Sequence, residues 1–210
     1  METRLQATSR EFEEARKTAI SVQDAFEAVK TKRFNLFNNA FTHISDQINS
    51  VYVELTRSEA YPLGGKAYLD IEEDTNTPYL SGIKYNAMPP LKRYRDMEHL
   101  SGGEKTMAAL ALLFAIHSYH PSPFFVLDEV DAALDNTNVG MIKKYLREHA
   151  GPGMQFIVIS LKIGLFQDSD TLVGVYRDQD VNSSRTLTLD VGYSSFFSVY
   201  IVSSCIFSCH

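Results

Sequence analysis

The apolar residues at the start of the chain follow a seven-residue repeat. Its members are Leu5, Phe12, Ala19 and Phe26, with Ala15, Val22 and Val29 three places after the last three of them. This spacing is that of the a and d positions of a coiled coil, and it runs over about four heptads. We therefore expect a coiled-coil arm over residues 1–33. A single amphipathic helix lying on the domain is the alternative, since the chain shows no evident partner strand.

The helical pattern continues beyond Arg33, but its apolar stripe becomes aromatic and its flanks carry less charge. The stripe consists of Phe34, Phe37, Phe41, Ile44, Ile48, Val51 and Leu55. A stripe of this kind is typical of a helix face packed on a core, so the helix is expected to pass from arm to globular domain here. Pro62 and Gly64-Gly65 then interrupt the pattern.

Short apolar runs and helical segments alternate through the remainder. Strands are expected at residues 68–72, 82–88, 124–127, 156–159, 171–176 and 185–191. Residues 107–116 are apolar without a break, which predicts a fully buried helix, and Thr137 is a plausible cap for a helix over residues 138–149. This order predicts an α/β domain over residues 34–191, with a parallel sheet covered by helices on both faces.

The last segment, residues 192–210, mixes serine with apolar residues and has no charge between Gly192 and Cys209. A packed tail strand, an extra sheet edge and an unnatural extension all fit it. Its six serines argue against a membrane span. The two cysteines, Cys205 and Cys209, cannot form a disulfide framework, and the charged N-terminus lacks a secretory signal.

A net charge of −6 gives no reason to expect bulk electrostatic binding of nucleic acid. A local basic patch is still compatible with it, and Lys92, Arg93 and Arg95 form one such cluster. We read this cluster either as a solvated loop or as support for phosphate or nucleic-acid contacts.

Two stretches carry candidate chemistry. Leu100-Ser101-Gly102-Gly103-Glu104 leads into a helix, where exposed N–H groups suit an anion and glycines let it approach. Asp128-Glu129 ends a buried strand, where paired carboxylates suit Mg²⁺ binding and water activation.

A phosphate-binding loop ending in Gly-Lys-Ser/Thr is absent from the sequence. Gly64-Gly65-Lys66 is followed by Ala67, which lacks the hydroxyl for magnesium. Either the chain is no nucleotide hydrolase, or its phosphate cradle lies on another segment.

The order of the motifs carries a family resemblance. Residues 100–104 look like the signature motif of ABC-type ATPases, residues 124–129 resemble their Walker B strand, and residues 132–135 resemble their D-loop. Together, these motifs and the sequence around them resemble the structural maintenance of chromosomes family, most of all its subunit-one branch in cohesin. The resemblance covers roughly residues 1–190. This resemblance implies the C-terminal lobe of an ABC-type P-loop ATPase head, preceded by a coiled-coil helix. Met1 would then be a fragment or gene-model boundary.

The resemblance also implies roles for individual residues. Asp128 matches the aspartate that holds Mg²⁺, and Glu129 the general base that orients the attacking water. Ser101, Gly102 and Gly103, within the signature of Leu100 to Glu104, match residues that reach ATP on the partner head. Asp135 matches the D-loop aspartate, which communicates between the two sites.

The implied partners are the N-terminal head lobe of the same protein, a second subunit of the family forming a heterodimer across two ATP molecules, a kleisin subunit and DNA. The implied location is the chromosome in the nucleus, and no membrane is expected. ATP hydrolysis is expected only when this lobe is joined to the N-terminal lobe and a partner head.

The chain departs from ABC transporters after its second core strand. Ser160-Leu161-Lys162 stand where transporters carry a switch histidine, which leaves the residue that senses the γ-phosphate unassigned. Three further hypotheses remain: a DNA-repair relative with the same architecture, a transporter nucleotide-binding domain, and a module that docks a kleisin and dimerises without hydrolysis.

Overall fold

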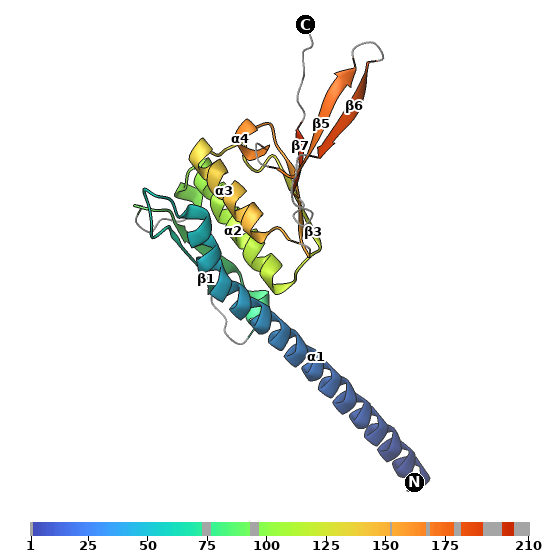
Figure 1. The fold of residues 1–210 in the computed structure, drawn as a ribbon. Coiled ribbons are helices and arrows are strands. Elements are labelled where there is room, and N and C mark those ends of the chain that lie inside the picture. Colours follow the sequence, from blue (N-terminus) through green and yellow to red (C-terminus); the bar gives the residue numbers. More distant parts are fainter. Residues whose placement is uncertain are drawn as a thin grey trace. The chain divides into compact units, whose positions relative to one another are not determined.

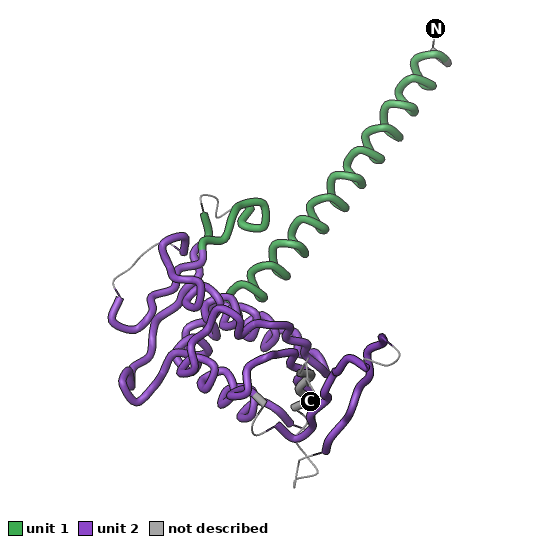
Figure 2. The backbone as a smooth tube through the Cα atoms, turned by 90° about the horizontal axis from the view of Figure 1, so that it is seen from above, with its two compact units in different colours: residues 1–43, 71–84 green, residues 44–70, 85–210 purple. Residues whose placement is uncertain are grey.

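The computed structural model describes residues 2–72, 77–92, 97–151, 153–166, 169–178, 182–190 and 199–203 (Figure 1). The chain divides into two compact units (Figure 2). One comprises residues 1–43 and 71–84, and the other comprises residues 44–70 and 85–210. The second unit contains the sheet and the helices packed on it.

A single helix, α1 (Glu2–Thr56), runs through both the expected arm and the start of the expected domain. In the first unit its seam residues are exposed, with 75% of Leu5 and 67% of Phe12 accessible. The Arg33 guanidinium lies 4.2 Å from the ring centre of Tyr79, which belongs to the 3-10 turn Pro78–Leu80. Helical spacing therefore predicted the right element, and coiled-coil pairing through its exposed seam stays a prediction.

The end of α1 belongs to the core of the second unit. Ile48, Tyr52 and Leu55 are fully buried there. The chain then turns at Gly64, whose φ of +63° favours glycine, and the Thr56 hydroxyl accepts a hydrogen bond from the Gly65 N–H at 2.8 Å. Strands β1 (Lys66–Ile71) and β2 (Ile83–Met88) follow as a two-stranded sheet, and a second 3-10 turn occupies Met97–His99.

The main sheet has the strand order β3-β4-β7-β5-β6. Its strands are β3 (Phe124–Asp128), β4 (Gln155–Ile159), β5 (Thr171–Asp178), β6 (Ser183–Asp190) and β7 (Val199–Ser203). The first four strands in this order pair in parallel, and β5 and β6 form an antiparallel hairpin. β7 lies inside the sheet, so this part of the expected tail is not an added edge; residues 191–198 and 204–210 lie outside the described residues.

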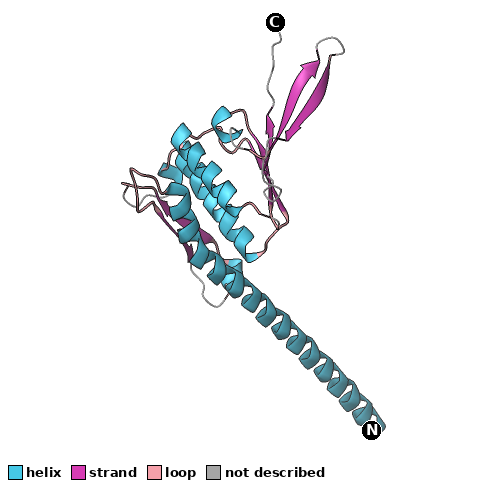
Figure 3. Ribbon diagram, in the orientation of Figure 1, coloured by secondary structure: helices cyan, strands magenta, loops and turns pink. Residues whose placement is uncertain are grey.

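Helices α2 (Gly102–Tyr119), α3 (Asn136–His149) and α4 (Ile163–Phe166) lie on one side of β3 and β4 (Figure 3). Phe114 of α2 is the centre of an aromatic cluster beneath α2 and α3. Its ring stacks on Tyr145 with centres 4.6 Å apart, and lies 5.8 Å from Phe125 and 6.3 Å from Phe156. One aromatic cluster thus joins α2, α3, β3 and β4.

The expectation that helices cover both sheet faces holds for one face only among the described residues. Phe124 and Val126 point away from the Phe114 side and are 55% and 51% exposed. The expectation of a fully buried α2 also needs correction, because Leu113 and Ile116 are 39% and 46% exposed. The described part of the chain provides no element that covers these side chains.

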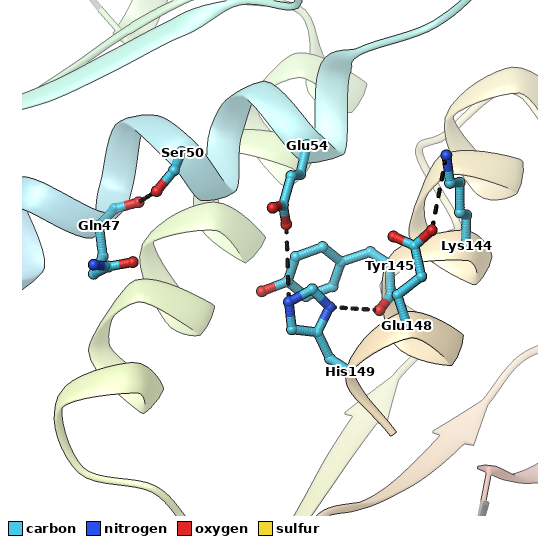
Figure 4. A network of polar contacts seen from close by, with 7 residues as sticks. All are labelled: Gln47, Ser50, Glu54, Lys144, Tyr145, Glu148 and His149. Carbon is cyan, nitrogen blue, oxygen red and sulfur yellow. Dashed lines mark hydrogen bonds and ion pairs between the residues drawn. The ribbon is translucent and has the colours of Figure 1, made fainter. Parts of the chain in front are cut away.

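A polar network joins the end of α1 to the last turns of α3 (Figure 4). His149 Nδ1 lies 2.9 Å from the Tyr145 carbonyl oxygen, and its ring stacks on the Tyr145 ring at 4.0 Å. His149 Nε2 is 3.8 Å from a Glu54 carboxylate oxygen. Both side chains of this contact are substantially exposed, so it contributes only about 0–1 kcal/mol when His149 is protonated.

Replacing Phe114 tests the importance of the aromatic cluster. Phe114→Ala should lower the free energy of unfolding of this chain by about 3–5 kcal/mol, because it removes a buried ring and leaves a cavity where α2, α3, β3 and β4 meet. The matched Phe124→Ala change, on a half-exposed ring of the adjoining strand, should cost less than about 1.5 kcal/mol. Urea unfolding followed by circular dichroism measures both, and equal losses would contradict the packing described.

Candidate functional site

The site begins where α2 begins, at Ser101. Its backbone is extended (φ −65°, ψ 162°), and its hydroxyl accepts a hydrogen bond from the Glu104 N–H at 3.4 Å. The Glu104 carboxylate in turn accepts from the Ser101 N–H at 2.9 Å. These two hydrogen bonds form a capping box, whose sequence pattern is a serine followed three residues later by a glutamate. The box fixes the point at which the helix begins. Leu100 is buried (5% exposed) and anchors the approach to the helix.

Lys92 binds the carboxylate oxygen of Glu104 that does not take part in the capping box. Its Nζ lies 2.6 Å from Glu104 Oε1. Partial burial raises the pKa of the Glu104 carboxyl, but hydrogen bonds from Lys92 and Ser101 outweigh that effect, so the pKa lies below its usual value. Of the basic cluster expected before the signature, Lys92 thus has a defined contact, while Arg93 and Arg95 lie outside the described residues.

The two signature glycines have different surroundings. A Cβ atom on Gly103 would lie 2.9 Å from the Ala133 carbonyl oxygen, so only glycine fits there without movement of that backbone. A Cβ on Gly102 would meet only the Ala133 methyl, at 3.8 Å. Gly103 is therefore required by packing against the turn before α3, and Gly102 is the glycine with open space in front of it. The sequence alone had assigned both glycines to anion approach.

Asp128 and Glu129 stand at the carboxyl end of β3, and both side chains are exposed. Asp128 is paired in register with Ile159 of β4, and the Glu129 N–H donates to the Ile159 carbonyl at 2.9 Å. Glu129 has a φ of +47°, which is uncommon for a residue with a side chain and costs on the order of 1–3 kcal/mol. Such outliers cluster at functional sites, where the surrounding structure maintains them.

The turn from Glu129 to Asp135 links β3 to α3. The Ala132 N–H donates to the Glu129 carbonyl at 3.1 Å, and the Leu134 N–H donates to the Asp131 carbonyl at 3.0 Å. Asp135 caps α3, with its carboxylate accepting from the Asn138 N–H at 2.8 Å. The expected cap, Thr137, is therefore wrong: the acidic side chain one residue before the helix occupies the stronger capping position.

The structure thus brings together the signature and the D-loop, through Gly103 and Ala133, and places Asp128 and Glu129 at the other end of the same turn. Two buried residues of this region escaped the sequence reasoning. Asp131 (2% exposed) accepts a hydrogen bond from the Ser160 hydroxyl (1% exposed) at 2.6 Å. A third acidic residue, only two positions after Glu129, was the available signal.

The donor set fits magnesium that arrives with a nucleotide. Within the described residues no group of three or more His, Cys, Asp or Glu side chains forms a metal cluster. Mg²⁺ is commonly held by one or two carboxylates together with substrate phosphates and water, and the exposed Asp128 carboxylate can supply such a contact. In the same part of the chain, no helix is long and apolar enough to cross a bilayer.

Residues 5–184 match the family described as RecF/RecN/SMC N terminal domain. The chain belongs to the structural maintenance of chromosomes (SMC) family. It is 62% identical to structural maintenance of chromosomes protein 1 of Schizosaccharomyces pombe over 92% of its length, and 54% identical to the Saccharomyces cerevisiae protein 1 over 90%. Protein 4 of S. cerevisiae is 40% identical over 81%. The chain spans 16% of the length of each protein 1 relative.

Solved SMC heads share the fold. An SMC head domain from Pyrococcus furiosus, with an extended coiled coil and bound to the C-terminal domain of ScpA, matches 81% of this chain and 40% of its own at a TM-score of 0.68 and 30% identity. A structure described under ATP-driven dimerization and DNA stimulated activation of SMC ATPases matches 75% of this chain and 90% of its own, at a TM-score of 0.65 and 32% identity. The α/β fold of an SMC ATPase head, expected from the motifs, is thereby confirmed.

The capping box predicts an acid-sensitive contribution to stability. Because the pKa of Glu104 is lowered from the usual 4.5, its contribution is complete above pH 4.5 and declines as the pH falls through the folded value. Glu104→Gln should therefore be less stable than the unmodified chain near neutral pH, and this difference should shrink in acid. Urea unfolding from about pH 7 to about pH 3 measures it. Glu148→Gln, in an exposed pair with Lys144, is the control; a Glu104→Gln deficit that is constant with pH would refute the assignment.

Proposed function

We propose that this chain is the C-terminal lobe of the ATPase head of a cohesin-type SMC subunit, using ATP and Mg²⁺ to drive engagement and separation of two heads. One observation carries the proposal. A single compact unit packs the signature helix start against the turn that follows the Walker B strand, yet its sequence holds no phosphate-binding loop. Such a unit supplies two partial nucleotide sites and completes neither alone.

The Walker B end serves the nucleotide of its own head. Asp128 would hold Mg²⁺, directly or through water, and the bound metal would supply charge neutralisation at the phosphates. Glu129 accepts a proton from the attacking water and orients it, a role that needs a carboxylate free to reach that water. Its exposure in this chain is compatible with that role.

The signature end serves the nucleotide on the partner head. The start of α2 offers the Gly102 backbone N–H and the positive end of the α2 dipole to a phosphate, while the Ser101 N–H is already donated to Glu104. Glu104 and Lys92 keep the cap in place, Leu100 anchors it, and Asp135 lies at the far end of the turn on which Gly103 rests. A second SMC subunit placing its own nucleotide here would form a heterodimer across two ATP molecules.

The remaining partners follow from the relatives. The 46–62% identity to protein 1 of several organisms supports a cohesin subunit, acting at the chromosome in the nucleus in sister chromatid cohesion, over a repair relative. A solved SMC head bound to the ScpA C-terminal domain supports a kleisin subunit as a partner, and the DNA-stimulated SMC ATPases support DNA.

The N-terminal lobe of the same protein is the proposed cover for β3. This strand lies at the edge of the sheet, so one side of its backbone has no strand partner in the described sheet. Its half-exposed Phe124 and Val126 also leave an apolar face open. An open edge together with an open apolar face suits the addition of further strands and a covering layer.

Glu129→Gln tests the catalytic assignment. In the complete SMC complex this substitution should reduce ATP turnover by at least about 100-fold, because the amide cannot accept the proton, while ATP binding and head engagement persist. Steady-state phosphate release and ATP-dependent cross-linking of the heads measure the two effects. The chain alone should show essentially no turnover. Unchanged turnover in the Glu129→Gln complex, or robust turnover by this chain alone, would refute the proposal.

Phe124→Asp tests the proposed cover. The charge would be tolerated in this chain, where the ring is 55% exposed, but would disfavour association with a separately expressed N-terminal lobe by at least about 10-fold. Titration calorimetry of the two lobes measures the change. Leu63→Asp, at an 89% exposed residue, is the control. Equal affinity of the Phe124→Asp chain would show that the N-terminal lobe lies elsewhere.

A further inference from the structure

The end of β4 holds the turn between β3 and α3 at three points. The Ile159 carbonyl accepts from the Glu129 N–H, the Ser160 hydroxyl donates to the Asp131 carboxylate, and the Lys162 ammonium donates to the Leu134 carbonyl. The last of these contacts immediately precedes Asp135. The three contacts are therefore spaced along the turn from the candidate base to the D-loop aspartate.

The contact between Ser160 and Asp131 is buried, and the Ser160 hydroxyl both donates and accepts a hydrogen bond there. Asp131 and Ser160 are 2% and 1% exposed, so water cannot replace either partner. The Ser160 hydroxyl donates to Asp131 Oδ2 at 2.6 Å and accepts from the Lys162 N–H at 2.9 Å. A carboxylate in such a place is stable only when its hydrogen bonds are supplied, which makes the Ser160 hydroxyl hard to substitute.

Glu129 is the residue that most needs external support. Its φ of +47° is unfavourable by itself, and an unsupported turn would relax toward a more common conformation. Relaxation would change the direction in which the Glu129 side chain leaves the backbone. A displacement of about 1 Å at a reacting group is enough to cost about 100-fold in rate.

We propose that Asp131, Ser160 and Lys162 form a latch that positions Glu129 and Asp135 for ATP hydrolysis. The latch rests on the function proposed above. It assigns Ser160-Leu161-Lys162, which stand where transporters carry a histidine, to holding the protein's own turn. Ser160 and Lys162 are accordingly positioning residues that act through the turn, and their loss slows the chemical step while nucleotide binding persists.

Lys162→Met in the complete SMC complex tests the latch. It keeps the aliphatic stem of a half-buried side chain and removes the donor to Leu134, so folding should be retained. The kcat for ATP hydrolysis should fall about 10- to 100-fold, with KM and ATP-dependent head cross-linking within about twofold of the unmodified complex. Lys162→Arg, which can donate to the same carbonyl, should restore most of the activity.

Lys144→Met on α3 is the matched control, because Lys144 is 66% exposed and forms a surface pair with its helix neighbour Glu148; it should leave kcat unchanged. Ser160→Ala should repeat the Lys162→Met result, and where it lowers the melting temperature of the complex, the Lys162 variants alone decide. The latch would be overturned if Lys162→Met left kcat unchanged, or if it raised KM and reduced cross-linking as much as it lowered kcat. Failure of Lys162→Arg to recover activity would also overturn it. The Glu129→Gln complex is assayed alongside: turnover that is insensitive to it would refute the proposed function rather than the latch.

Discussion

The parallel pairing of β3 with β4 is the constraint on which the site depends. Its register places Asp128 beside Ile159, so the segments after both strands leave the sheet at the same edge. Packing sets this register, because Leu127 and Val158 must both face the helices. A slip of one residue would turn Leu127 outward and carry Asp128 into the core. The hydrophobic core therefore decides where the carboxylates emerge.

Under the proposed function, the turn after β3 connects two partial nucleotide sites. On one side the turn is held by the segment after β4, through Ser160. On the other side it packs against the start of α2, where Gly103 has no side chain and lets the Ala133 carbonyl come close. Movement of the turn at Ala133 would push against the start of α2, since a packed backbone contact has no slack. The candidate base and the signature N–H groups are thus coupled through one short segment. Under the proposed function, this segment would be the physical basis for communication between two nucleotides.

Sequence patterns predicted the elements well where one local signal decided them. Heptad spacing predicted the start of α1, and the serine and two glycines before the apolar run predicted the start of α2. They failed where a choice depended on distant contacts. Asp135 rather than Thr137 caps α3, and Gly103 is fixed by Ala133, thirty residues away in the chain. The pairing of Asp131 with Ser160 needs the strand register before it can be seen. The prediction that helices cover both faces of the sheet failed for a similar reason. Periodicity shows which residues are apolar, but it does not show which element packs on them.

The open apolar face and the open nucleotide site lie on the same strand. Phe124 and Val126 alternate with Phe125 and Leu127, and the strand that carries them ends in Asp128. Under the proposed function, one association event would cover the apolar face and bring a phosphate cradle to the carboxylates. The hydrophobic gain from covering β3 would then assemble the site, and turnover would be confined to the joined head. Under the same proposal, the lobe would be inactive alone, because one partner would complete both its open sheet and its nucleotide site.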